Sequence, residues 1–213
     1  MDTGAERGGE SCWFADLAPD RTVRAIEPLP WNVNSIQQLA RTRTNIKVVQ
    51  GGLGSKDRFV KFKGEGAAKH TKSGSMLISV HTAPSAVLDN TTNAQYSFRV
   101  RRLDDLYEHD WRGARLAFGH FDVEGAELDL LEGADVVIQR HRPVFTVEFS
   151  DGRRGTTSRN ALFKHIVRYK YRCYAIPEQC GLKADCRNAV CFPAERDAPE
   201  ALLTNASVAL VTS

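Results

Sequence analysis

The sequence lacks the features of a membrane-spanning segment and of a secretory leader. No apolar run approaches the ~20 residues that a helix needs to cross a bilayer, and residues 1–10 are rich in Asp, Glu, Arg and Gly, unlike a signal peptide. Dense Lys/Arg clusters are also absent, and 29 basic with 26 acidic residues leave a formal net charge of only +3. These absences exclude a membrane span in this stretch and make nucleic acid a poor partner candidate. They leave the oligomeric state open.

Closely paired cysteines of the C-x₂-C type are absent as well. Four of the five cysteines lie near the C-terminus, with six, five and four residues between them: Cys173, Cys180, Cys186 and Cys191. This spacing does not match common zinc sites. We expect unpaired, small hydrophobic core residues here, with disulfides in an oxidising compartment as the alternative. The compartment stays open: the cytoplasm is favoured, and the lumen of the secretory pathway is the alternative.

Alternating strand and helix patterns predict one α/β domain over residues 1–213 with a mostly parallel sheet. Apolar strand patterns at 23–28, 45–49, 116–123 and 144–149 are separated by amphipathic helix patterns, and such alternation favours right-handed crossovers. Two stretches fit neither pattern. We predict that residues 64–95 form a cover over the ligand edge of the sheet, with a solvated insertion as the alternative, and that residues 177–206 form a C-terminal loop region.

The chain is organised around residues 116–133, where an apolar strand pattern stops at acidic residues and a helix pattern begins. Asp122 and Glu124 follow the strand, and Gly125 permits a tight turn. The carboxyl ends of strands in an open α/β sheet are where ligands bind, so both acids are candidate site residues. The alternative is that Glu124 and Glu127 only cap the helix, an effect of about 0.3–1 kcal/mol each.

The N-terminus contains a glycine-rich loop with the spacing Asp-x-Gly-x-x-x-Gly, formed by Asp2, Gly4 and Gly8. This spacing differs from the G-x-G-x-x-G of dinucleotide sites. Glu27 ends the next strand pattern, twenty-three residues after Gly4, and an acid at this position suits the hydroxyls of a ribose. Loop and acid together favour a cofactor that contains a nucleoside. An ordinary turn and a surface acid remain the alternatives.

Together these blocks resemble the FkbM-type S-adenosylmethionine-dependent methyltransferases over residues 2–150. The resemblance implies a Rossmann-like class I methyltransferase fold, which is a three-layer sandwich, and S-adenosyl-L-methionine as the methyl donor. It also implies transfer to a hydroxyl, here on a small molecule or a glycan. The blocks that carry it are Asp2-x-Gly4-Ala5-x-x-Gly8, Ile26-Glu27-Pro28 with Asn32, Leu103-Asp104-Asp105-Leu106, Asp122 to Glu127, Leu131 to Ala134, and Pro143 to Glu148.

The resemblance assigns seven residues to the donor. Glu27 would take the ribose hydroxyls, Leu53 with its neighbouring backbone would flank the adenine, and Asp122 would line the site between donor and acceptor. The donor's amino-acid end would be held by four residues: Asp2, Gly4, Ala5 and Gly8.

One departure from the family pattern concerns the first, central strand, because only Met1 precedes Asp2. About five buried apolar side chains at ~1.5–3 kcal/mol each would then be missing, a sum comparable with the ~5–15 kcal/mol stability of a whole domain. We therefore expect a fold that lacks most of this strand, with two unpaired inner edges in the sheet, and a chain that is a fragment or starts further upstream.

Methyl transfer needs no metal, but a hydroxyl acceptor must lose its proton to a nearby base. Asp122 is the first candidate for this role, followed by His120, where the family often has Lys, and by Glu124. Two other functions stay open. The chain is an inactive or binding-only relative of the enzymes in one alternative, and a nicotinamide-dependent oxidoreductase in the other, although the dinucleotide glycine spacing is missing.

Overall fold

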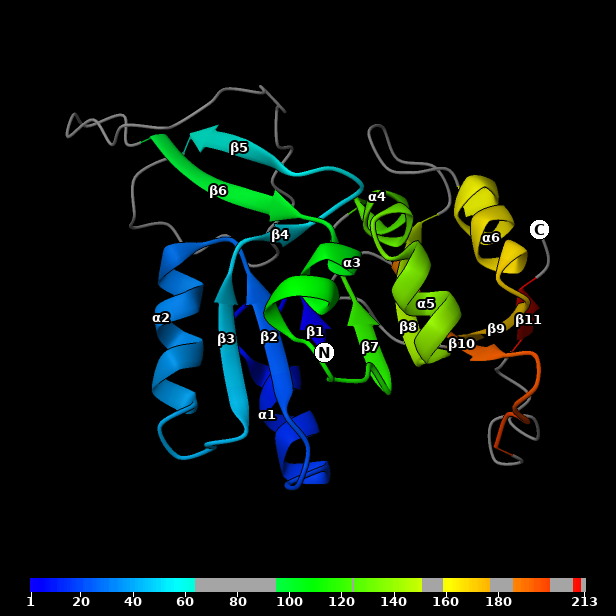
Figure 1. The fold of residues 1–213 in the computed structure, drawn as a ribbon, viewed down its shortest axis with the longest axis horizontal. Helices are drawn as coiled ribbons and strands as arrows, with labels where there is room; N and C mark the ends of the chain where they lie inside the picture. Colours follow the sequence, from blue (N-terminus) through cyan, green and yellow to red (C-terminus); the bar gives the residue numbers. More distant parts are fainter. Residues whose placement is uncertain (64–94, 124, 151–158, 177–185, 200–208, 212–213) are drawn as a thin grey trace.

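Two sheets of different size form the fold in the computed structural model, which describes residues 1–63, 95–123, 125–150, 159–176, 186–199 and 209–211 (Figure 1). The larger sheet has eight strands and the smaller has three. In spatial order, the large sheet contains β11 (Ala209–Val211), β9 (Tyr171–Ile176), β10 (Cys186–Pro193), β8 (Val144–Ser150), β7 (Phe118–Phe121), β1 (Asp2–Thr3), β2 (Val23–Glu27) and β3 (Ile46–Gln50). The small sheet contains β4 (Gly52–Leu53), β6 (Gln95–Arg101) and β5 (Arg58–Lys63).

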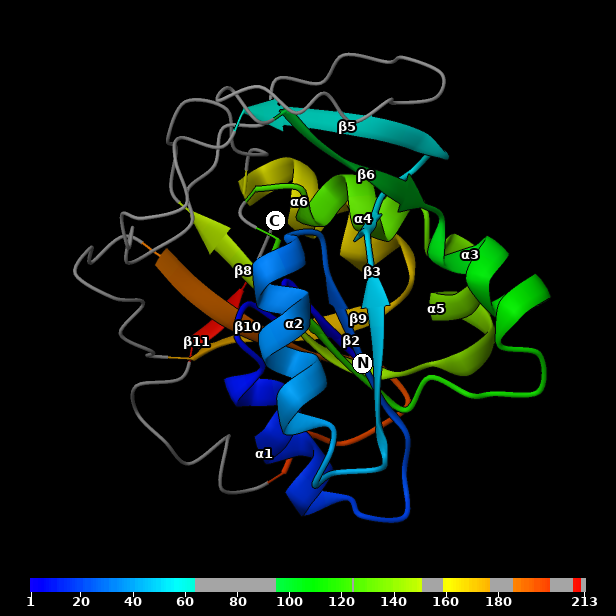
Figure 2. The same ribbon diagram turned by 90° about the vertical axis from the view of Figure 1, so that its left-hand side faces the viewer.

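The large sheet is parallel from β8 through β7, β1 and β2 to β3. Beyond β8, strands β10, β9 and β11 are antiparallel to their neighbours. The predicted α/β class with a mostly parallel central sheet is therefore confirmed. The small sheet lies above the carboxyl ends of β2 and β3 (Figures 1 and 2).

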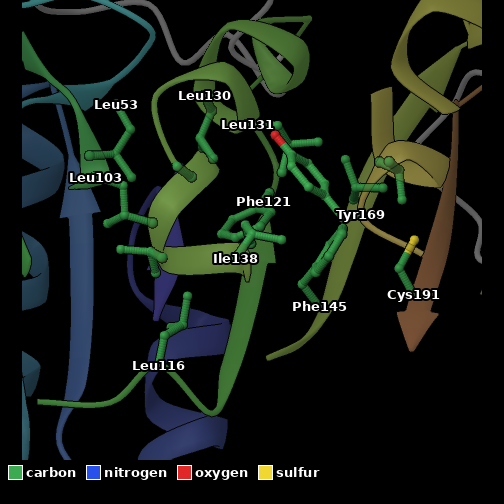
Figure 3. Packing of buried hydrophobic residues seen from close by; sticks show 14 of the residues in the cluster. Leu53, Leu103, Leu116, Phe121, Leu130, Leu131, Ile138, Phe145, Tyr169 and Cys191 are labelled. Carbon is green, nitrogen blue, oxygen red and sulfur yellow. The ribbon is translucent and has the colours of Figure 1, made fainter. Parts of the chain in front are cut away.

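Helices cover both faces of the large sheet. One face carries α1 (Gly9–Leu17) and α2 (Pro30–Leu39), which pack on Ala25 and Ile46. The larger core, on the other face, joins Phe121 and Phe145 to Leu131 and Ile138 (Figure 3). The elements on this second face are α3 (Leu103–Asp105), the π-helical turn η1 (Leu106–Asp110), α4 (Glu127–Glu132), α5 (Asp135–His141) and α6 (Arg159–Arg168). No helix in the described parts of the chain is long and apolar enough to cross a membrane.

The central strand β1 is only two residues long, as expected, yet it is paired on both sides. Asp2 lies opposite Ala25 of β2 and His120 of β7. The main chain of Met1 extends the contact, because its carbonyl accepts the N–H of His120 at 2.8 Å. The expectation of two unpaired inner edges is thus wrong for this part of the sheet, which is the part next to the glycine loop.

Two further expectations are corrected. The predicted loop 177–206 contains β10, which lies between β8 and β9 and is antiparallel to both. Register places Cys191 directly opposite Cys173, and a disulfide joins them, so the expectation of unpaired cysteines is wrong for this pair. The expected cover at 64–95 lies outside the described residues, apart from Gln95 in β6.

The helix pattern after the central strand is broken into α4 and α5 at Gly133. A Cβ on Gly133 would lie 1.9 Å from the carbonyl oxygen of Gly54, so this glycine lets the backbone of the β4–β5 turn approach. Asp104 then caps the N-terminus of α5, because its Oδ1 accepts the N–H of Val137 at 2.9 Å. The N–H of Asp104 also donates to the carbonyl of Gly133 at 3.0 Å, so two of the family-like blocks are in direct contact where α4 ends and α5 starts.

Candidate functional site

The glycine loop after β1 crosses the carboxyl ends of β2 and β7. Gly4 has a φ of +79°, and a Cβ on it would lie 1.7 Å from the carbonyl oxygen of Asp122. The N–H groups of Gly4 and Ala5 both donate to the carbonyl of Ile26, at 3.0 and 3.3 Å. Only glycine permits this approach. The structure thereby brings the predicted loop, Glu27 and Asp122 to one edge of the sheet.

Gly8, the second glycine of the loop, has a φ of +88° and directly precedes α1. A Cβ there would lie 3.1 Å from the side chain of Ile36 and 3.2 Å from that of Leu39, both on α2. Its role in this structure is therefore to let α1 start close against α2.

Asp2 lies almost fully buried in β1, with 1% of its surface exposed. Its Oδ2 accepts a hydrogen bond from the Ser11 hydroxyl on α1, while its Oδ1 has no hydrogen-bond partner among the described residues. Burial raises the pKa of Asp2, and the hydrogen bond from Ser11 opposes this rise. A buried carboxylate oxygen without a donor is costly, so Oδ1 is a position where a ligand N–H would be stabilising.

Glu27 is buried as well, with 3% exposure, which contradicts the alternative of a surface acid. Its Oε2 accepts the N–H of Glu6 at 2.9 Å, and its Oε1 accepts the N–H of Leu29 at 2.9 Å and the Asn32 amide at 3.3 Å. Burial raises the pKa of Glu27, and these hydrogen bonds oppose the rise. Because a carboxylate has about four acceptor positions, roughly one remains on Oε2 for a further donor.

Asp122 directly follows β7 and is half-buried. Its N–H donates to the carbonyl of Thr3 at 3.1 Å, so its backbone is held by β1. Glu127 holds the turn that follows, because its Oε1 accepts the N–H groups of Val123 at 3.1 Å and Gly125 at 3.0 Å. Glu127 thus has a structural role, which is to hold the turn that precedes α4. Glu124 lies outside the described residues.

Burial raises the pKa of Glu127 to about 7, its backbone hydrogen bonds oppose this rise, and the charge of Asp122 adds to it. Only 3% of Glu127 is exposed. Two carboxyl groups with different surroundings therefore lie at the end of β7.

His120 lies one step back from the carboxyl edge, inside the sheet. It is opposite Asp2 on one side and Thr146 on the other. Its Nδ1 is 2.6 Å from the Thr146 hydroxyl, and its ring packs edge-on against Phe14 of α1 at 5.9 Å. Ser11 and Thr146, the polar partners of Asp2 and His120, were not expected from the sequence, because no motif marks them.

Leu53 is buried in β4, and its side chain points into the large core next to Leu103 (Figure 3). It also lines a cavity of about 230 Å³ at the ends of β2 and β3. The other lining residues are Ile26, Val49, Gln50, Gly51, Gly52, Arg99, Arg101 and Leu106. Apolar residues and glycines are prominent in this lining, which also includes two arginines.

A family model for the Methyltransferase FkbM domain matches residues 2–177. The chain belongs to this family. The resemblance drawn from the motif blocks is confirmed, and the family match extends past residue 150 and includes α6 and β9.

One solved structure agrees with this assignment at the level of the fold. The methyltransferase FkbM from Methylobacillus flagellatus KT superposes with a TM-score of 0.59 at 18% identity, and the match covers 90% of this FkbM chain and 42% of that protein. This chain thus spans about two-fifths of the length of that protein. The precorrin-6y C5,15-methyltransferase from Geobacter metallireducens GS-15 has a TM-score of 0.45 at 13% identity, covering 90% of this chain and 76% of that one. No curated protein matches the chain significantly.

Among the described residues of the FkbM domain, no three His, Cys, Asp or Glu side chains are grouped as a metal site requires.

Proposed function

We propose that this FkbM domain transfers a methyl group from S-adenosyl-L-methionine to a hydroxyl oxygen of a small molecule or a glycan. The observation that carries the proposal is the convergence of the Gly4 loop, Glu27 and Asp122 at the carboxyl ends of three adjacent strands. Family membership supports methyl transfer as the reaction. The donor and the hydroxyl acceptor are what the family resemblance implies, and the chemistry of the edge supports the donor.

The residues at this edge fit the donor. Oδ1 of Asp2, buried and without a hydrogen-bond partner among the described residues, suits the ammonium of the donor's amino-acid end. The remaining acceptor position on Glu27 suits a ribose hydroxyl. The cavity beside Leu53 suits the adenine ring, although the Leu53 side chain itself belongs to the core, so backbone and neighbouring side chains would provide most of the contact.

The domain's own residues then have distinct tasks. When bound, S-adenosylmethionine supplies a methyl group attached to a positively charged sulfur. Asp122, at the strand end and half-buried, would take the proton of the acceptor hydroxyl as that oxygen bonds to the methyl carbon and the carbon–sulfur bond breaks, so that the sulfur leaves as a neutral thioether. Thr3 and Glu127 hold the backbone on either side of Asp122, and such positioning provides much of the rate in this kind of transfer. His120 is set back inside the sheet, opposite Asp2 and in hydrogen-bond contact with the Thr146 hydroxyl. It is therefore the less suitable base.

Isothermal titration calorimetry of the purified chain tests the proposal. S-adenosylmethionine and S-adenosylhomocysteine should both bind, whereas NAD should not. Glu27→Ala should weaken binding about tenfold or more, because the hydrogen-bonded carboxylate is lost, and Glu132→Ala, on the exposed side of α4, should leave it unchanged. Saturable binding of NAD alone would refute the proposal in favour of an oxidoreductase, and absence of binding to all three would favour the inactive relative.

We also propose an oxidising compartment for this domain in place of the favoured cytoplasm. The support is the Cys173–Cys191 disulfide, since such bonds persist in oxidising surroundings.

A further inference from the structure

Glu127 is a buried acid that has no positively charged partner among the described residues. Its Oε1 accepts hydrogen bonds from the N–H groups of Val123 and Gly125, and no ion pair to it is present among the described residues. With 3% exposure it also has little water. Two neutral N–H groups stabilise a buried carboxylate less than a cation does, so its charge depends on what else occupies the site.

The charged groups near Glu127 do not compensate a negative charge on its carboxylate either. Asp122 is the negative group that acts on it across the turn. Asp129, on the same helix, is engaged by Arg58 and Ser55. Helix α4 also packs on β8 and α6. On those elements, Glu148 alternates with the buried Val147 and Phe149 and so faces the opposite side of the sheet, and His165 is bound to Tyr169 at 2.6 Å. Among the described residues, Asp122 is therefore the charged group that acts on Glu127, and it is negative.

We propose that Glu127 distinguishes the positively charged methyl donor from its neutral product. It is ionised when a sulfonium lies at the end of β7, and it holds a proton when the sulfur is a neutral thioether. This inference rests on the proposed function, since it assumes that S-adenosylmethionine binds at this edge. It assigns Glu127 as a positioning residue, which acts through the turn that carries Asp122 and through its own charge.

Linkage fixes the sign of the effect. With a pKa of about 7 in the free protein, Glu127 is mostly protonated below neutral pH and ionised above it. A sulfonium favours the ionised form, so raising the pH should strengthen binding of S-adenosylmethionine relative to S-adenosylhomocysteine. From the size of charge interactions near a protein surface, we expect the ratio of the two affinities to rise about threefold to tenfold between about pH 6 and about pH 8.

Calorimetric titration of the full chain with both ligands at the two pH values tests this. The wild type should show the rise in affinity ratio, and Glu127→Gln, which keeps an oxygen acceptor for the two N–H groups but has no charge, should show it reduced or absent. Glu132→Gln, an exposed position on the same helix, should behave as the wild type. The ligands' own amino groups titrate identically with every variant, so the comparison between variants removes their contribution.

The same pH dependence in the wild type and in Glu127→Gln would overturn the inference while leaving donor binding intact. Absence of binding of either ligand to the wild type at both pH values would instead overturn the proposed function. A ¹³C NMR titration of the Glu127 carboxyl in the wild type does not depend on the variant's folding. Its midpoint should fall when S-adenosylmethionine is bound and should stay higher with S-adenosylhomocysteine, and equal midpoints in the two complexes would refute the proposal.

Discussion

Replacing Gly4 by alanine tests whether the close approach of the glycine loop to β7 builds the site. Alanine at a φ of +79° costs about 1–2 kcal/mol in backbone strain. The added Cβ would also lie 1.7 Å from the Asp122 carbonyl oxygen, where real Cβ contacts stay above 3.0 Å. Because the neighbour is backbone and cannot rotate away, loop and strand must separate, at a further cost of about 1–3 kcal/mol.

The chain offers a matched control at Gly113, whose φ is +77° and whose Cβ would meet nothing within 4 Å. Gly113→Ala should therefore lose only the backbone term, about 1–2 kcal/mol, and bind S-adenosylmethionine as the wild type does. Gly4→Ala should lose about 2–5 kcal/mol in all and bind the donor at least about tenfold more weakly. Urea denaturation and calorimetry measure the two effects. Equal losses of stability and equal donor affinity in both variants would refute the reasoning, because strain alone would then explain Gly4.

Three further predictions concern residues away from the loop. Because the folded-state pKa of Glu127 is raised from 4.5 to about 7, its contribution to stability should be lost as pH rises from about 4.5 through 7, by up to about 3 kcal/mol, and urea melts of Glu127→Gln should lack this loss. Asp104→Ala should destabilise the domain by about 1–2 kcal/mol, because the N-terminus of α5 loses its cap; an unchanged denaturation midpoint would contradict this. Reduction of Cys173–Cys191, which closes a separation of 18 residues, should cost about 3 kcal/mol, and equal melting of the oxidised and reduced protein would exclude a stabilising disulfide.

The sequence predicted the architecture best where hydrophobic periodicity and strand ends coincide. The strand before Asp122, the glycine loop and the acid at the end of β2 all lie where their patterns placed them, because period and turn residues are local properties. The arrangement of β4, β5 and β6 into a separate sheet depends on pairing over long sequence distances, which no local pattern reports. β10 was missed for the same reason: its pairing with β8 and β9 makes a strand out of a stretch that contains no clear signal.

At the site, the sequence indicated which residues converge but not how each is satisfied. Nothing in the pattern separates Glu27, with three internal donors, from Asp2, with one oxygen left without a partner among the described residues. Likewise His120 and Asp122 are two residues apart in the sequence. Only the register shows that His120 lies between Asp2 and Thr146 inside the sheet, while Asp122 lies at its edge.

A central strand of two residues still positions the site because the contacts that matter are at its carboxyl end. The carbonyl of Thr3 accepts the N–H of Asp122, and the carbonyl of Ile26 accepts those of Gly4 and Ala5. A few backbone hydrogen bonds therefore join the three strands at this edge. Opening of this corner breaks these bonds and the side-chain bond from the Glu6 N–H to Glu27, which is far less than global unfolding breaks, and it therefore costs less free energy. A ligand that binds only the closed corner shifts this equilibrium by mass action. Donor binding should accordingly protect the amides of Gly4, Ala5 and Asp122 from hydrogen exchange more than it protects those of β9 and β10, which lie at the other end of the sheet.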